Sequence, residues 1–197
     1  QDASRDLLKM FGAGITEQTF SPIMYSLRKR LPWLYINLLT AFLAAAVVAV
    51  FESTIARITA LAVFLPVVAG QGGNAGNQSL AVVMRGIVMR EIPRTKVWNL
   101  VAKESTIGLI NGITIGLVTA LIAWVWYGNG MLGVVIGTAM IVNLFVAGLS
   151  GAAIPLIMKT LGFDPAQSSS IVLTTITDVV GFFAFLGFAT IFESYLM

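Results

Sequence analysis

The sequence lacks cysteine and histidine, two residue types that carry much of protein chemistry, and it is poor in charge. The absence of cysteine excludes disulfides, thiolate metal sites and cysteine nucleophiles. The absence of histidine removes the usual ligand of zinc and haem and the side chain that exchanges protons near neutral pH. Charged residues make up 11% of the 197 residues and hydrophobic residues 57%, whereas soluble domains carry about 25% charged residues. These values exclude an ordinary water-soluble fold and favour a membrane protein.

Five long apolar segments are candidates for membrane-spanning helices, which need about 20 residues each. As one straight helix the second segment would extend for about 52 Å, against a hydrocarbon core of about 30 Å. It contains the glycine- and amide-rich stretch Gly70–Gln78, where we expect an interruption that lines a cavity or packs against protein. A glycine-rich packing seam is the alternative for this stretch. The sequence therefore predicts an all-α integral membrane protein with five transmembrane helices per subunit, at residues 32–51, 55–89, 105–127, 131–158 and 168–192.

The charged residues indicate how the chain lies in the membrane. Residues 1–30 predict a short amphipathic cytoplasmic helix and a linker, broken at Ser21-Pro22, ahead of a five-helix transmembrane domain at residues 31–197. Of the 12 Lys and Arg residues, all but Arg57 fall on one side of the five-span arrangement. Basic loops mark the cytoplasmic side, so we expect a cytoplasmic N-terminus and an external C-terminus in the plasma (inner) membrane. Topology and anionic lipid explain these basic loops, and no binding to nucleic acid is expected.

Asp178 is the only acid that the sequence places deep inside a predicted span. A carboxylate at the middle of a bilayer costs at least about 2.5–3.5 kcal/mol, and no Lys or Arg lies at a comparable depth. Asp178 therefore needs a polar partner, a water-filled path or a bound cation. On a helix, Ser170 and Thr174 share one face with Asp178 because the three recur every four residues, and Thr177 is a further candidate to line such a path. The alternative is a protonated or hydrogen-bonded Asp178 with a structural role only.

Small and amide residues inside the spans are expected to mediate contacts between helices. Gly181, one turn beyond Asp178, allows the close approach of another backbone. Single amides are expected to hydrogen-bond between helices, at Asn37, Asn111 and Asn143.

The candidate ligands are carboxylate, hydroxyl, amide and carbonyl oxygens, which suit hard cations such as Mg²⁺, Ca²⁺ and Mn²⁺. One acid per chain under-compensates a divalent charge, whereas a twofold dimer with Asp178 near its axis supplies two carboxylates. The scarcity of protein ligands favours an ion that keeps its water, and Mg²⁺ dehydrates reluctantly. The residues alone thus rank a divalent-cation pathway first, with Mg²⁺ ahead of the other ions. No second acid or nucleophile is found at depth, so an enzyme is not expected.

Four segments resemble characteristic stretches of a known family. They correspond to parts of its second helix, its fifth helix, and the start and end of its first helix, and they are Pro66–Gln78, Thr174–Phe182, Arg30–Leu34 and Phe51–Glu52. On these segments the chain resembles the MgtE magnesium channels. The resemblance implies a homodimeric Mg²⁺ channel whose pore lies at the dimer interface, walled mainly by the second and fifth helices.

The resemblance also implies roles for individual residues. Asp178 matches the acid that holds hydrated Mg²⁺ in the pore, and Thr174 and Ser170 match positions that line the same site. Mn²⁺, Co²⁺ and Ni²⁺ are further candidate ions. The second-helix amides that face the pathway match Asn74, Asn77 and Gln78.

Members of this family usually carry cytoplasmic regulatory domains, including a CBS pair, and residues 1–20 resemble the helix that connects such domains to the pore. The resemblance thus implies regulatory domains upstream. Asp2 and Asp6 would meet Asp164 and form a secondary cytoplasmic Mg²⁺ site that closes the channel when Mg²⁺ is abundant. A solvated acidic helix end is the alternative for these acids. The second functional hypothesis is a transporter that couples divalent-cation movement to Na⁺ or H⁺.

Overall fold

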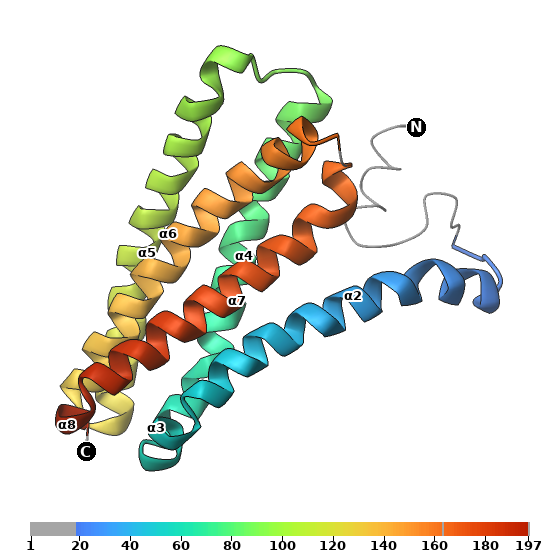
Figure 1. Cartoon of the computed structure of the whole chain (residues 1–197). Helices are drawn as coiled ribbons and strands as arrows, with labels where there is room; N and C mark the ends of the chain where they lie inside the picture. The colour runs from blue at the N-terminus through green and yellow to red at the C-terminus, as the bar shows by residue number, and fades with distance from the viewer. Residues whose placement is uncertain (1–18, 163, 197) are drawn as a thin grey trace.

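Residues 19–162 and 164–196 are described by the computed structural model of the chain, and they form helices joined by short connections (Figure 1). Within these residues there is no strand, so the predicted all-α class is confirmed. The predicted N-terminal cytoplasmic helix falls mainly on residues 1–18, outside the described residues. The elements are α2 (Ile23–Val50), α3 (Glu52–Arg57), α4 (Ala60–Val88), the short 3₁₀ helix η1 (Arg94–Lys96), α5 (Val97–Tyr127), α6 (Gly130–Thr160), α7 (Pro165–Ile191) and α8 (Glu193–Leu196).

Four helical segments are long and apolar enough to cross a membrane. They correspond to four of the five predicted spans. The helix α4 is also long, at 29 residues, but its glycines and amides make it more polar, so composition alone does not mark it as a span. The four segments are Ile23–Val50, Arg94–Tyr127, Gly130–Thr160 and Ser169–Ile191.

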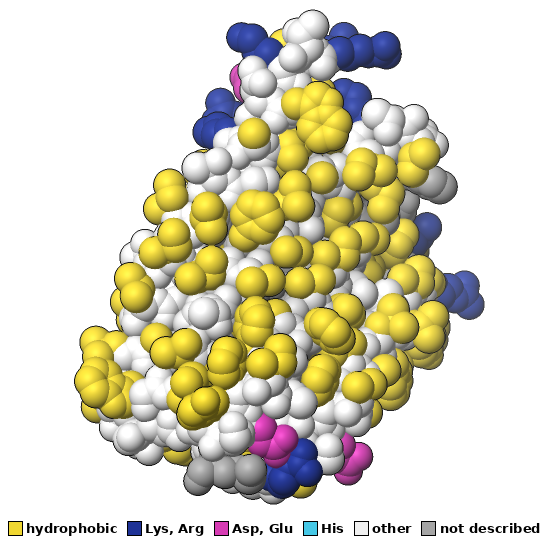
Figure 2. Space-filling model, turned by 60° about the vertical axis from the view of Figure 1, so that its left-hand side comes forward, with side chains coloured by type: hydrophobic (Ala, Val, Ile, Leu, Met, Phe, Trp, Pro, Cys, Tyr) yellow, Lys and Arg dark blue, Asp and Glu magenta, His cyan; other side chains and the backbone are white. Residues whose placement is uncertain are grey.

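The surface of the bundle is apolar over a wide area. Figure 2 shows hydrophobic side chains over most of one face, with Lys, Arg, Asp and Glu at its margins. On α5, Ile110, Leu117 and Val125 are 58%, 67% and 76% exposed. Soluble monomers rarely expose a continuous apolar surface of this kind, and the surface suits contact with lipid acyl chains.

The helix α2 begins at Ile23, ahead of the predicted start of the first span, and Pro32 lies inside it. Pro22 directly precedes its first residue, so a helix boundary lies at Ser21-Pro22, and residues 23–30, predicted as a linker, are helical instead. Only Ala44 is buried along this helix, and its first half diverges from the other helices (Figure 1). The second half packs on α7 and leads into α3.

The helices α5 and α6 have the most extensive contact of any pair of described elements. Gly108 and Gly112 lie along the contact, and a Cβ atom at Gly108 would lie 2.4 Å from the carbonyl oxygen of Leu144 on α6. Small residues at this seam let the two backbones touch, as is typical of membrane helices. The turn between them requires Gly128, whose φ of 69° is left-handed, and Asn129 Oδ1 then accepts hydrogen bonds from the first two backbone N–H groups that follow Gly130.

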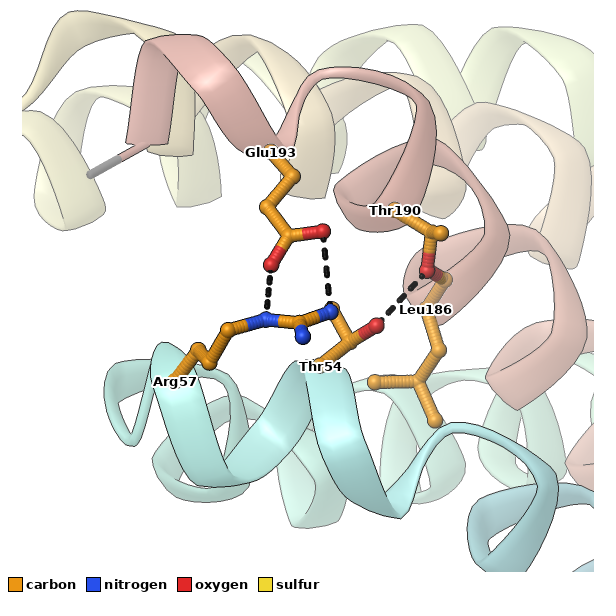
Figure 3. Close-up of polar contacts among 5 residues, drawn as sticks. All are labelled: Thr54, Arg57, Leu186, Thr190 and Glu193. Carbon is orange, nitrogen blue, oxygen red and sulfur yellow. Dashed lines mark hydrogen bonds and ion pairs between the residues drawn. The ribbon is translucent and has the colours of Figure 1, made fainter.

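Polar contacts join α3 to α7 and α8 at the end of the bundle that also carries the C-terminus (Figure 3). Arg57 donates two hydrogen bonds to the carboxylate of Glu193, of which the bond from Nη2 to Oε2 measures 3.1 Å. The hydroxyl oxygens of Thr54 and Thr190 lie 3.1 Å apart. Because Thr190 already donates to the carbonyl of Leu186 at 2.8 Å, Thr54 is the donor between the two hydroxyls. These contacts hold α3 against α7 and α8.

Candidate functional site

The helix α4 runs without interruption from Ala60 to Val88 and includes the whole glycine- and amide-rich stretch. The predicted interruption at Gly70–Gln78 is therefore wrong. A continuous helix satisfies its own backbone hydrogen bonds, which is the main requirement on backbone inside a bilayer. The predicted second segment is divided earlier instead, because α3 ends at Arg57 and α4 starts only at Ala60.

Two glycines of this stretch pack closely against neighbouring helices. A Cβ atom at Gly76 would lie 2.8 Å from Cδ1 of Leu173 on α7, and one at Gly72 would lie 2.5 Å from Nδ2 of Asn143 on α6. The packing-seam alternative thus describes this face of α4, because a side chain at Gly72 or Gly76 would require its neighbour to move.

The opposite face of α4 carries exposed amides. Asn74, Asn77 and Gln78 are all exposed, and their spacing of three and four residues places them on one side of the helix. Gly70 and Gly73 lie near them, and a Cβ atom at either would meet nothing within 4 Å. The subunit itself therefore leaves a polar strip of amides uncovered along a helix whose other side is packed.

Asp178 on α7 lies at the level of this strip. The helices α4 and α7 pack side by side and run in opposite directions (Figure 1). Gly76 on α4 lies against Leu173 on α7. Further along the two helices, Gly72 and Gly181 both lie against the side chain of Asn143 on α6. Since Asp178 lies between Leu173 and Gly181 on α7, it is level with the α4 turn between those two contacts, and this turn carries one of the exposed amides.

The carboxylate of Asp178 has a buried oxygen without a partner. The residue is half-buried, and its Oδ1 atom is buried with no hydrogen-bond donor among the residues that the structure describes. The ion pairs found within the same residues join Arg57 to Glu193 and Lys103 to Glu104, so neither neutralises Asp178. A buried carboxylate oxygen without a donor is costly, and the site therefore suits a cation or the water molecules that a cation carries.

The hydroxyls predicted beside Asp178 divide into two groups. Ser170 and Thr174 are half-buried, and Thr174 Oγ1 donates to the carbonyl of Ser170 at 2.9 Å. A hydroxyl that donates in this way keeps its lone pairs for a ligand. Thr177 is fully buried and donates to the carbonyl of Thr174 at 3.0 Å. Thr177 therefore lies in the interior of the subunit and is not exposed to a pathway along its surface.

Asn143 joins helices, as predicted for the single amides. Its Nδ2 atom on α6 donates to the carbonyl of Val68 on α4 at 2.8 Å. Gly181 does allow a close approach, but the group that approaches is the Asn143 side chain, since a Cβ atom at Gly181 would lie 2.8 Å from its Cγ. The predicted approach of a second backbone to Gly181 is therefore wrong.

A second acid, Glu104, lies buried within α5, one residue before the predicted start of the third span. Glu104 is thus a buried acid that lies outside the predicted spans and was not singled out from the sequence. Glu104 is 4% exposed. Ser79 Oγ on α4 donates to its Oε2 at 2.6 Å, and Lys103 Nζ lies 3.6 Å from its Oε1. The signal available in the sequence was the adjacent Lys103-Glu104 pair directly before an apolar run.

A cavity of about 220 Å³ adjoins Glu104 between α4 and α5. Its polar lining includes Gln78, Asn111 and Lys103. Because protein groups already engage both oxygens of Glu104, this acid is satisfied without a ligand. The cavity thus adjoins an acid whose two oxygens both have partners, whereas the buried oxygen of Asp178 has no donor among the described residues.

The predicted secondary site rests on the turn between α6 and α7. Gly162 has a left-handed φ of 79°, which favours glycine, and Asp164 is exposed directly before Pro165, the first residue of α7. Asp2 and Asp6 lie outside the described residues. Their approach to Asp164 therefore stays a prediction.

Within the described residues no group of three His, Cys, Asp or Glu side chains gathers. Residues 65–188 match the MgtE family, which is described as a family of divalent cation transporters. The chain belongs to the MgtE family. The resemblance noted in the sequence is thereby confirmed, and the family match covers α5, α6 and most of α4 and α7.

Relatives in this family are similar over almost the whole chain. The magnesium transporter MgtE of Enterococcus faecalis is 35% identical over 100% of this chain and 43% of its own length. The proteins of the same name from Bacillus subtilis and Thermus thermophilus are 33% and 32% identical, over 98% and 95% of the chain and 43% and 42% of their own lengths. The chain thus spans less than half of the length of these MgtE relatives. All three are named as transporters, in agreement with the expectation that the chain is not an enzyme.

Proposed function

We propose that this chain forms the membrane domain of a Mg²⁺-selective channel with its pore at a homodimer interface. In this proposal α4 also crosses the membrane, as the second of five spans, the N-terminus is cytoplasmic and the C-terminus lies outside. The observation that carries the proposal is the buried Oδ1 atom of Asp178, which has no partner among the described residues and lies level with the exposed amides of α4. The named function of the MgtE relatives supports the choice of ion.

The dimer follows from the polar strip on α4. Amides cannot face lipid acyl chains without loss of hydrogen bonds, so Asn74, Asn77 and Gln78 need a polar surface or water opposite them. A second copy of the chain supplies the same strip across a twofold axis. Two copies of Asp178 then face one pathway and together balance the charge of a divalent ion.

The arrangement suits a cation that keeps its water. Along α7, Thr174 and Ser170 lie about 6 Å and about 12 Å from Asp178 toward the cytoplasmic end of the pathway. Their oxygens and the α4 amides accept hydrogen bonds from the water around Mg²⁺, while the two carboxylates hold its charge. The membrane potential drives entry, since it contributes about 2.3 kcal/mol per elementary charge per 100 mV, doubled for a divalent ion.

The test is ion flux through the purified protein in liposomes. With a Mg²⁺ gradient alone and no imposed Na⁺ or H⁺ gradient, we expect Mg²⁺ uptake, and we expect Asp178→Asn to reduce both the uptake and the preference for Mg²⁺ over monovalent ions. Uptake that requires a Na⁺ or H⁺ gradient would favour the coupled transporter instead. Unchanged selectivity in Asp178→Asn would refute the role of this acid. Parallel assays with Mn²⁺, Co²⁺ and Ni²⁺ define the range of ions that pass.

The regulatory part of the proposal concerns the cytoplasmic side. Asp164, at the start of α7, is close in sequence to the polar face that leads to Asp178, so a cation bound at Asp164 would act on the pore helix directly. We propose that Asp2 and Asp6 complete this secondary site and that cytoplasmic regulatory domains act through it. Asp164→Asn is expected to weaken the inhibition of flux by Mg²⁺ on the cytoplasmic side, and unchanged inhibition would refute this part.

A further inference from the structure

Asn143 occupies a slot that three helices share. It lies in the middle of α6, is 0% exposed, and donates from Nδ2 to the carbonyl of Val68 on α4 at 2.8 Å. A Cβ atom at Gly72 on α4 or at Gly181 on α7 would collide with its amide, at 2.5 Å and 2.8 Å. The amide is therefore held between α4 and α7 and fills the space that two glycines leave.

The amide is not explained by packing alone. Its Nδ2 atom faces a carbonyl, which only accepts, so the hydrogen bond fixes which end of the amide is the oxygen. The Oδ1 atom is then buried without a donor among the described residues. A leucine of similar size would fill the slot and leave no unpaired oxygen. The chain thus keeps a polar group at a position where an apolar side chain would be more stable.

The slot lies beside Asp178. Gly181 is three residues after Asp178, one helical turn further along the same side of α7. Within the described residues, Asp178 Oδ1 and Asn143 Oδ1 are the two buried side-chain atoms without a hydrogen-bond partner. The two least satisfied oxygens of the bundle therefore occur at one level, where α4 and α7 meet.

We infer that Asn143 is a positioning residue for the ion pathway, which sets both the separation of α4 from α7 and the rotation of α4 at the level of Asp178. The slot sets the separation, because the amide keeps the two glycine backbones one side chain apart. The directional bond to Val68 sets the rotation, because it ties one carbonyl of α4 to α6. The rotation decides where Asn74 points, and the separation decides the distance from that amide to Asp178. This inference rests on the proposed function of Asp178.

The first experiment separates positioning from stability. Asn143→Leu is compared with the starting protein for Mg²⁺-dependent flux in liposomes and for thermal unfolding in detergent. We expect an unchanged or higher unfolding temperature, because the unpaired oxygen is gone. We expect the Mg²⁺ concentration at half-maximal flux to rise by about three- to tenfold, in the range of couplings carried by residues that do not touch the ligand. Asn111→Leu, a half-buried amide on α5, is the matched control and is expected to leave this concentration unchanged.

The outcomes decide between the hypotheses. A flux that falls in parallel with the unfolding temperature would mean that Asn143 is structural only, and an unchanged flux would also overturn the inference. Asp178→Asn is measured in the same assay. If Asp178→Asn lowers Mg²⁺ selectivity and Asn143→Leu does not change the concentration dependence, only the inference on Asn143 fails. If Asp178→Asn has no effect, the proposed function fails and the inference fails with it.

A second experiment tests the slot without any transport assay. Gly72→Ala is expected to lower the unfolding temperature, because its new methyl group meets the Asn143 amide. In Asn143→Ala the slot is open, so the double variant Gly72→Ala/Asn143→Ala is expected to be more stable than the sum of the two single effects. Gly73→Ala is the matched control, since a Cβ atom there meets nothing within 4 Å. Additive effects in the double variant would refute the shared slot.

Discussion

Glu104 on α5 and Asp178 on α7 are both carboxylates inside the helical bundle, but the protein satisfies only the first of them. Glu104 accepts a hydrogen bond from Ser79 and pairs with Lys103, whereas Asp178 retains a buried oxygen that no described residue donates to. A buried charge is tolerated when it is paired and hydrogen-bonded. The comparison indicates that Glu104 joins α4 to α5, and that the buried oxygen of Asp178 is available to a ligand from outside the subunit.

The largest effect is expected on transport, when one of these two acids is neutralised and the other is kept. Asp178→Asn is expected to lower Mg²⁺ flux at least about tenfold, which corresponds to the loss of about 1.4 kcal/mol of ion binding, with little change in stability. Glu104→Gln is the matched variant, because it also neutralises a buried acid and keeps an acceptor for Ser79. It is expected to leave Mg²⁺ selectivity intact. If both variants lose selectivity equally, the distinction between the two acids is wrong.

The next effect is on stability and concerns Glu104. Glu104→Ala removes a hydrogen bond to a charged acceptor and leaves the Ser79 hydroxyl unpaired, so we expect the free energy of unfolding to fall by about 1.5–3 kcal/mol. Denaturant unfolding in detergent micelles measures this change. Asp178→Ala is the counterpart and should destabilise much less, because no protein donor loses its acceptor. A larger loss for Asp178→Ala would contradict the assignment of a structural role to Glu104 alone.

A smaller effect is expected from the partner hydroxyl. Ser79→Ala removes the donor to Glu104 Oε2 and should cost about 1 kcal/mol of unfolding free energy. In the background of Glu104→Ala the same substitution should cost almost nothing, because the acceptor is already gone. Four unfolding curves give this coupling energy. A cost that is independent of the residue at 104 would show that the short contact in the structure is not an energetic bond.

The smallest effect is expected at the opposite end of the bundle. Arg57 and Glu193 also form a charged pair, but the Arg57 side chain is 51% exposed, so water competes for it. Arg57→Ala should change the unfolding free energy by about 0.2–1 kcal/mol, with a decrease of the effect at high salt. A loss as large as that of Glu104→Ala would mean that the position of α3 depends on this pair more than its exposure indicates.

Much of the fold was predictable because it depends on local composition. Four of the five apolar segments correspond to helices able to cross a membrane, and the helix start after Ser21-Pro22 agrees with the predicted break. The continuity of α4 through Gly70–Gln78 was not predicted. Glycine weakens an isolated helix, but here it allows contact with Leu173 and Asn143, and this tertiary packing outweighs the local propensity.

The candidate site was predictable in part for the same reason. Asp178 stands out in the sequence because the surrounding residues are apolar and lack a positive charge, and no described residue neutralises it in the structure. The inward direction of Thr177 could not be predicted, since Thr174 and Thr177 lie on overlapping faces of a helix. The partner of Glu104 could not be predicted either, because its donor Ser79 is 25 residues away.

The sequence by itself determined that this protein is helical, that its long helices are apolar enough for a membrane and that its candidate ligands are oxygens, because these properties follow from composition and from helical periodicity. Only the tertiary structure decided which acid is neutralised and which is left open. That choice depends on contacts between distant segments, such as the bond from Asn143 to Val68 across 75 residues. A residue's partners across helices are set by how the helices pack, and no local pattern encodes them.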